Sequence, residues 1–489
     1  MNSNVHQHRV ILQRIAHRVM IERGLLPDFE PAVLTELSKL KEPAIKPSAQ
    51  VRDLTGLLWA SIDNDDSRDL DQLTVAEALP DGTTRVLVAV ADVDSLVALD
   101  SEIDRHARHN TTSVYTAAEI FPMLPENLST NLTSLNLNED RRAIVVELVV
   151  DASGLVQKSD LYPAWVRNHA KLAYNSVAAW LDNSAPMPEA VAAVNGLDQN
   201  LKLQDAVAAK MKELRHQHGA LTFETIQPKA EFEGDQIKGI NAEFSNRAKA
   251  IIEDFMIAAN GVTARFLETK KFPSIRRVVR TPKRWDRIVQ IAGEHRVNLP
   301  AEPDSKALED FLAKARIADP VRFPDLSLSV IKLLGAGEYV AELPGETAPG
   351  HFGLAVKDYA HSTAPNRRYP DIITQRLLKA AINGVQVPYS DEELRQLAQH
   401  CTEQEDAANK VERQVNKSAA AMFLESRIGE RFDAIVTGSG PKGTWVRLIN
   451  PPIEGKLETV SDGPDVGQRV HVQLMRTDVE RGFIDFRAV

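Results

Sequence analysis

The sequence predicts a chain of three parts: a short helical N-terminal region, a central α/β (α+β) domain and a C-terminal all-β barrel. From Val51 to about residue 428, strand-like apolar runs alternate with segments of helical spacing. After Gly429 the texture changes to short β segments separated by glycines. With 489 residues, the chain has the length expected for two or three domains with a buried core.

Residues 1–50 hold two helical patterns. The first covers residues 5–23 and has a helical apolar face made of Val10, Ile11, Ile15 and Val19. The second runs from about Pro31 to Leu40, and residues 41–50 then form a proline-containing linker. Two interpretations stay open: a helix-turn-helix-like reader of DNA or RNA, or a plain helical hairpin that caps the next domain.

The central part, residues 51–428, begins with the strand patterns "GLLWASI", "TRVLVAVADV" and "RRAIVVELVVD". Helical patterns follow at about 196–216, 246–268, 283–296, 306–317, 365–383 and 391–428. The last part, residues 429–489, contains "RFDAIVTGSGPKGTWVRL", "EGKLETV" and a final β-rich segment. Its length and its glycine turns are those of a small β-barrel.

Composition narrows the class of protein. A hydrophobic fraction of 43% with 26% charged residues is typical of globular proteins, and no apolar run approaches the ~18 residues of a membrane span. The N-terminus lacks the apolar core of a signal peptide. One cysteine, Cys401, excludes a disulfide framework and favours a reducing cytoplasm. A net charge of −10 argues mildly against nucleic acid, although it says little about a cleft.

The stretch "SIDNDDSRDLDQ" concentrates carboxylates where the strand "LLWASI" ends. An EF-hand needs glycine and glutamate at its sixth and twelfth loop positions, where this chain has Arg68 and Thr74, so that interpretation fails. The remaining alternatives are a solvated acidic turn and a metal site. Asp69 and Asp71 lie two apart, so on an extended backbone they point the same way. Converging carboxylates favour magnesium, which serves phosphodiester cleavage in two-metal sites.

Two basic segments supply the cations that a phosphate-binding site needs. Residues 270–287 carry eight lysines and arginines, including Arg276 and Arg280, against one acid. This run is either a nucleic-acid track or a solvated helix face. In "HSTAPNRRYPD", Arg367 and Arg368 stand near the start of a predicted helix, where paired hydrogen bonds to a phosphate are favoured.

These segments together resemble the RNase II/RNase R family of exoribonucleases. "SIDNDDSRDLDQ", "VAVADV", "TTSVYTAAEIFPMLPENLS", "IIEDFMIAAN", "HFGL" and "YAHSTAPNRRYPDIITQRLL" occur in the family's order between about Asp53 and Leu378. The last 60 residues resemble the RNA-binding OB domain, of the ribosomal protein "S-one" type, that ends those enzymes. The resemblance implies an RNB-type catalytic domain over residues 51–428, followed by an OB barrel over residues 429–489.

By the same resemblance, the chain is a magnesium-dependent enzyme that processively hydrolyses single-stranded RNA from 3′ to 5′ and releases nucleoside 5′-monophosphates. One or two magnesium ions are expected, and manganese could substitute. The implied ligands are Asp63, Asp69, Asp71 and, in place of a fourth aspartate, Gln72. Asp69, Asp71 and Arg367 are the expected catalytic residues. The expected RNA contacts are Tyr115, Tyr174, Arg367, Arg368, Glu253, Asn260, Arg276, Arg280 and Trp445, of which Trp445 is either a stacking ring or part of the barrel core.

Three departures from the family pattern stand out. Gln72 brings no charge to the metal site, so a second ion should bind less tightly. The first 50 residues are too short for the cold-shock OB domains that usually begin these enzymes. No aromatic residue lies between Phe272 and Trp285 to form a second stacking plate opposite Tyr115.

Rival interpretations follow from these departures. The first is a catalytically weak or silent RNA-binding protein with a decayed metal site. The second is a DNA nuclease with an N-terminal helix-turn-helix. The favoured hypothesis treats DNA as at most a poor substrate or an inhibitor, and expects a cytoplasmic monomer that has no membrane contact.

Overall fold

The computed structural model describes residues 7–41, 51–440, 443–458, 464 and 466–489. Its centre is a mixed seven-stranded sheet of order β1-β8-β7-β4-β3-β2-β9. β1 pairs parallel to β8 and β2 pairs parallel to β9, while the other neighbours are antiparallel. The strands are β1 (Arg52–Asp53), β2 (Ala60–Asp63), β3 (Gln72–Ala78), β4 (Thr84–Ala91), β7 (Asp140–Val150), β8 (Val156–Arg167) and β9 (Ala170–Ala173).

The middle of this sheet is covered on both faces. Every residue from Val86 to Ala91 in β4 is at most 2% exposed, whereas a half-solvated strand would alternate. The neighbouring helices are α3 (Glu102–Asn110), α4 (Tyr174–Leu181), α5 (Glu189–Ala192), α6 (Leu197–Gln217), α7 (Arg247–Thr269) and α11 (Tyr369–Asn383). α6 packs on β3, and α7 packs on β2, β4, β7 and β8. Two short hairpins complete this region: β5 (Val114–Tyr115) with β6 (Ile120–Phe121), and β10 (Gln227–Glu233) with β11 (Gln236–Glu243).

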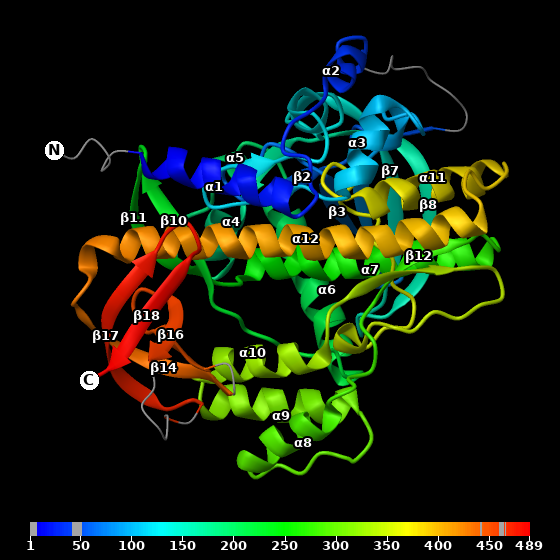
Figure 1. Ribbon diagram of the computed structural model, residues 1–489. Helices are drawn as coiled ribbons and strands as arrows, with labels where there is room; N and C mark the ends of the chain where they lie inside the picture. The colour runs from blue at the N-terminus through cyan, green and yellow to red at the C-terminus, as the bar shows by residue number, and fades with distance from the viewer. Residues whose placement is uncertain (1–6, 42–50, 441–442, 459–463, 465) are drawn as a thin grey trace.

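A helical lobe stands apart from the sheet at the bottom of Figure 1. It consists of α8 (Trp285–Glu294), α9 (Ser305–Ala318) and α10 (Phe323–Leu334). Its apolar residues form a separate core around Trp285, Phe311 and Phe323. The lobe is inserted between β12 (Ser274–Val278) and β13 (Glu338–Glu342), which pair with each other.

One long helix links the central domain to the barrel. α12 (Asp391–Leu424) starts with a capping box made by Ser390 and Glu393, and it crosses the whole molecule in Figure 1. The barrel that follows is closed, with strand order β14-β15-β16-β18-β17. Its strands are β14 (Arg431–Gly440), β15 (Gly443–Leu448), β16 (Glu454–Glu458), β17 (Arg469–Asp478) and β18 (Phe483–Ala488). The predicted mixed central domain and C-terminal barrel are therefore confirmed.

The N-terminal region forms the two predicted helices, α1 (His8–Glu22) and α2 (Pro31–Leu37). α1 packs along α12, and α2 packs against α3. Most of the predicted linker, residues 42–50, lies outside the described residues. Among the described helices, we find none with the length and apolar content needed to cross a membrane.

Candidate active site

The acidic stretch lies between two strands of the central sheet. Asp63 ends β2, and Asp69 and Asp71 come just before β3. The negative charge of Asp63 acts on Asp69, and that of Asp69 acts on Asp71, so the three carboxyl groups form one electrostatic cluster. Asp65 and Asp66, in the same loop, are exposed.

Asp71 is the most deeply placed of the three, at 3% exposed. Burial raises its pKa to about 8 and the charge of Asp69 adds to this, while Arg367 and the backbone N–H of Asn366 oppose the shift. Burial also raises the pKa of Asp69. Buried carboxyl groups that repel each other hold protons at neutral pH unless another cation compensates them.

The donor set therefore fits a hard cation such as magnesium, which prefers carboxylate oxygens. The fit rests on this chemistry and not on a preformed ligand shell. Within the described parts of the chain, no three His, Cys, Asp or Glu side chains are arranged so that they could hold a metal ion.

Arg367 is the cation that faces the cluster. Its Nε lies 3.7 Å from Asp71 Oδ2, and its side chain is 44% exposed. Two backbone contacts fix the segment around it: the Asn366 N–H donates to Asp71 Oδ1 (2.9 Å), and the Ser113 N–H donates to the Arg367 carbonyl (3.0 Å). α11 begins two residues later. Arg367 thus has both a fixed backbone and an accessible guanidinium.

Arg368 is placed differently, and its expected contact with the phosphate stays a prediction. Its Nη2 donates to Asp371 Oδ1 (2.9 Å), and that carboxylate is fully buried. The Arg368 side chain is 19% exposed, against 44% for Arg367. Its guanidinium is therefore used to hold the start of α11.

Two tyrosines flank the carboxylates. Tyr115, in β5, is 39% exposed, and its hydroxyl group acts to lower the pKa of Asp69. Tyr174 begins α4. Burial raises the pKa of both phenols; Asp69 adds to the shift at Tyr115 and Asp63 adds to it at Tyr174, which places each ring beside the acidic cluster.

Two other predicted site residues, Gln72 and Asn260, contact the segment that leads to Arg367. The Gln72 side-chain amide donates to the Thr363 carbonyl, so its nitrogen holds the segment that leads to Arg367. Asn260 is 2% exposed and accepts hydrogen bonds from the backbone N–H (2.9 Å) and hydroxyl (2.8 Å) of Ser362. It thus supports the same segment from behind instead of lining the site. Glu253 lies exposed on α7.

The expected RNA track along residues 270–287 is wrong for Arg276. This residue is 1% exposed, and its Nη2 donates to Glu342 Oε1 (2.6 Å). Arg280 is exposed but pairs with Glu338. Both acids belong to β13, which follows the helical lobe in sequence and then pairs with β12. Counting the charges within residues 270–287 could not include these two glutamates, because they lie far along the sequence.

Trp445 lies on the outside of the barrel. Thr444, Val446 and Leu448 alternate with it and are buried, while Trp445 is only partly covered. It pairs across the sheet with Gly438 and Lys456. Since Trp445 is not in the barrel interior, its ring is available on the outer face.

Sequence reasoning missed Glu412. Its Oε1 accepts the Tyr115 backbone N–H at 2.8 Å, and burial raises the pKa of this carboxyl group. Glu412 lies in the middle of α12, in a helical pattern with many other charged residues. Only the packing of α12 against β5 distinguishes it from them.

Comparison with known proteins assigns the family. The RNB domain model matches residues 51–384, and the model of the RNase II-type exonuclease C-terminal S1 domain matches residues 430–489. Ribonuclease R of Aquifex aeolicus is 30% identical, over 97% of this chain and 70% of that protein. Ribonuclease R of Escherichia coli is 31% identical, over 90% of this chain and 56% of that protein.

A solved structure of Mycoplasma genitalium RNase R in complex with ribose-methylated single-stranded RNA has the same fold. The TM-score is 0.88 at 22% identity, and the match covers 98% of this chain and 78% of that one. The two matched models account for both the region that contains the carboxylate cluster and the barrel. The chain belongs to the RNase II/RNase R family, with an RNB domain followed by an S1 domain.

Proposed function

We propose that the protein is a magnesium-dependent exoribonuclease that processively degrades single-stranded RNA from its 3′ end to nucleoside 5′-monophosphates in the cytoplasm. The observation that carries the proposal is the half-exposed Arg367 beside the carboxyl groups of the buried Asp71 and the partly buried Asp69, with two tyrosine rings near them. Membership in a family of exoribonucleases supports it.

Each side chain has a defined task in this reaction. Asp63, Asp69 and Asp71 would hold magnesium, which when bound supplies an activated water and stabilises the leaving 3′ oxygen. Arg367 neutralises charge that builds on the phosphoryl oxygens, and its half-exposed guanidinium has room for a phosphate. Tyr115 stacks on the terminal base, which is worth ~1–3 kcal/mol and tolerates any sequence.

The barrel binds the RNA upstream of the phosphodiester bond that is hydrolysed. Trp445 lies on its outer face beside Lys456. A ring beside a cation suits single-stranded RNA, because bases stack on the ring while the cation attracts the backbone. The rival proposal, an RNA-binding protein with a decayed metal site, rests on Gln72 in place of a carboxylate.

Digestion of 5′-labelled RNA decides between them. We expect shortened products and nucleoside 5′-monophosphates with magnesium, arrest by EDTA, and recovery when magnesium or manganese is added back. Asp71→Asn should stop turnover and leave RNA binding intact. Intact RNA that shifts in a gel would support the silent binder, and equal cleavage of single-stranded DNA would support the DNA nuclease. An excess of unlabelled RNA added after the start tests processivity.

A further inference from the structure

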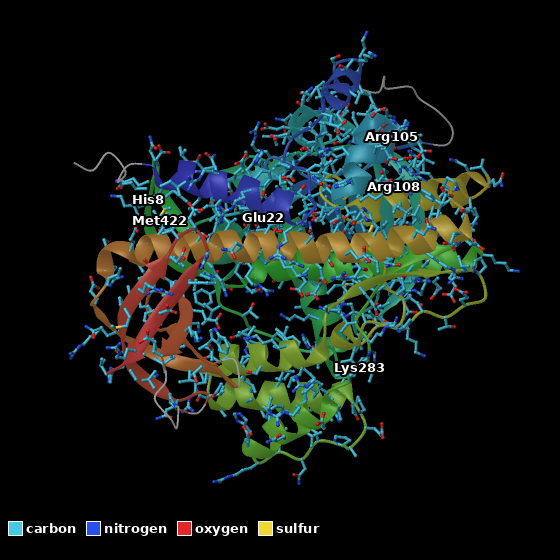
Figure 2. All side chains as sticks on the ribbon, viewed as in Figure 1. His8, Glu22, Arg105, Arg108, Lys283 and Met422 are labelled. Atoms are coloured by element: carbon cyan, nitrogen blue, oxygen red, sulfur yellow. The ribbon has the colours of Figure 1, made fainter. Side chains whose placement is uncertain are left out.

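The N-terminal segment 8–29 covers the back of the hairpin that carries Tyr115. α1 runs antiparallel to α12: His8 lies at the end of α12 that bears Met422, and Glu22 lies farther along it (Figure 2). The buried face of α1 shares one hydrophobic core with α12 and with the apolar residues of the hairpin. The α1 members are Leu12, Ile15, Ala16, Val19 and Met20, and the hairpin members are Val114, Ala118 and Phe121.

This packing answers the question left open for the first two helices. The buried side of α1 is occupied by protein, and Arg14 and Arg18 on its outer side pair with Glu480 in the turn between β17 and β18. α1 therefore braces the barrel and the hairpin, which does not favour a nucleic-acid-reading helix.

Asn110 connects the N-terminal segment to the strand that enters the hairpin. It is the last residue of α3 and is 1% exposed. Its Nδ2 donates to the Leu26 carbonyl (2.8 Å), and its Oδ1 accepts the Leu26 N–H (2.9 Å). One side chain thus satisfies both backbone groups of Leu26. Next to it, on the exposed side, the His109 ring nitrogen contacts the Gly24 carbonyl at 2.8 Å.

Thr111, the residue that follows Asn110, has a strained backbone conformation. Thr111 has a φ of 58°, in the left-handed region that a β-branched residue rarely adopts. Such strain persists only where surrounding contacts fix the backbone. The two hydrogen bonds of Asn110 provide that fixation on one side, and the Tyr369 N–H, which donates to the Thr111 carbonyl (2.8 Å), provides it on the other.

The next four residues lead directly into the active site. Ser113 donates its backbone N–H to the Arg367 carbonyl. Val114 is fully buried in the core with α1, whereas Tyr115, which points the other way, stands at Asp69. The position of the Tyr115 ring is therefore determined by the strand whose start Asn110 holds.

We propose that Asn110 is a positioning residue: by clamping Leu26 it fixes the 111–115 strand, so that Tyr115 meets the 3′-terminal base beside the carboxylates. This inference rests on the proposed exoribonuclease function and gives residues 8–29 a role in placing the substrate. A displaced ring would lose stacking and leave the phosphate contacts of Arg367 in place.

The test compares two RNAs that differ only in their last nucleotide, which has a base in one and is abasic in the other. The measured quantity is the ratio of kcat/KM for removal of that nucleotide. Stacking should give the wild-type protein a ratio of about 5 to 150. Tyr115→Ala should bring the ratio close to one, and Asn110→Ala should lower it at least threefold.

The chain offers a matched control in Asn200. Its Nδ2 donates to the Ala76 carbonyl (2.8 Å) and its Oδ1 accepts the Ala76 N–H (3.2 Å). Asn200 thus makes the same pair of hydrogen bonds between α6 and β3. Asn200→Ala should keep the wild-type ratio. A variant that merely loses folded enzyme lowers both rates equally, so the ratio separates positioning from folding.

An Asn110→Ala protein with the wild-type ratio would overturn the inference. If that variant does not fold, Asn110→Asp, which keeps an acceptor for the Leu26 N–H and loses the donor to the Leu26 carbonyl, decides in the same way: a lowered ratio supports the inference and an unchanged one overturns it. A wild-type protein that digests both RNAs equally well overturns the inference alone. One that digests no RNA overturns the proposed function as well.

Discussion

Arg367 Nε lies 3.7 Å from Asp71 Oδ2, which joins a half-exposed cation to a buried carboxylate. This pair connects the loop before β3 to the segment before α11, and the charge of Arg367 is the main influence that opposes the raised pKa of Asp71. The arginine therefore lowers the pKa of a carboxyl group in the cluster while its own side chain stays 44% exposed.

We expect Arg367→Ala to lower kcat by ~10²–10³-fold, because charge on the phosphoryl oxygens would lose its stabilising donor. Arg367→Lys should recover only part of the rate, since a point charge cannot make paired hydrogen bonds. Single-turnover digestion measures this, with the exposed Arg105→Ala as a control. A loss below threefold would remove Arg367 from the reaction.

Gln72→Asp distinguishes a structural from a metal-binding role for that position. An aspartate cannot donate to the Thr363 carbonyl, so we expect a loss of ~1–3 kcal/mol in the free energy of unfolding and slower digestion. The resemblance alone implies a different result, namely a lower magnesium concentration at half-maximal rate. A magnesium titration and a urea melt, run on the same variant, show which of the two occurs.

Arg276→Ala should destabilise the protein without weakening RNA binding. Its guanidinium is buried against Glu342, and removing one partner of a buried pair costs ~3–5 kcal/mol. Arg280→Ala is the matched control, because Arg280 pairs with Glu338 on the same strand but is exposed, and its loss should cost under ~1 kcal/mol. A large drop in the RNA affinity of folded Arg276→Ala would contradict the assignment.

Two buried histidines should make the fold sensitive to acid. Burial lowers the pKa of His106 and of His351 to about 4, whereas an unfolded chain has a value near ~6.5. The stabilisation is fully present above pH ~6.5 and is lost as pH falls toward 4, because the unfolded state then binds more protons. Each histidine contributes up to ~3 kcal/mol. Urea unfolding at pH 7.5 and 5.0 measures the slope, which His106→Phe should reduce.

Local patterns were sufficient to predict several elements, such as β4, β7 and α12, but not α3, α10 or β8. The strand "LLWASI" and the two-residue spacing of Asp69 and Asp71 specify where carboxylates leave the sheet, and α12 begins at the predicted residue. The partners of Arg276, Arg280 and Tyr115 could not be found in this way. They come from β13 and α12, and their positions depend on tertiary packing that no short stretch of sequence encodes.

The shared core of α1, the β5–β6 hairpin, α12 and the barrel has a practical consequence. Its members range from Leu12 to Phe486, so α1 and the barrel belong to one core, and both pack against α12. A shortened protein that ends at residue 428, or one that begins at residue 51, would expose this apolar surface to water. If such a truncated protein lost activity, the loss would result from a misplaced β5–β6 hairpin and from aggregation. It would not measure how much the missing part contributes to RNA binding. Point variants on the outer face of the barrel, such as Trp445→Ala, avoid this confusion.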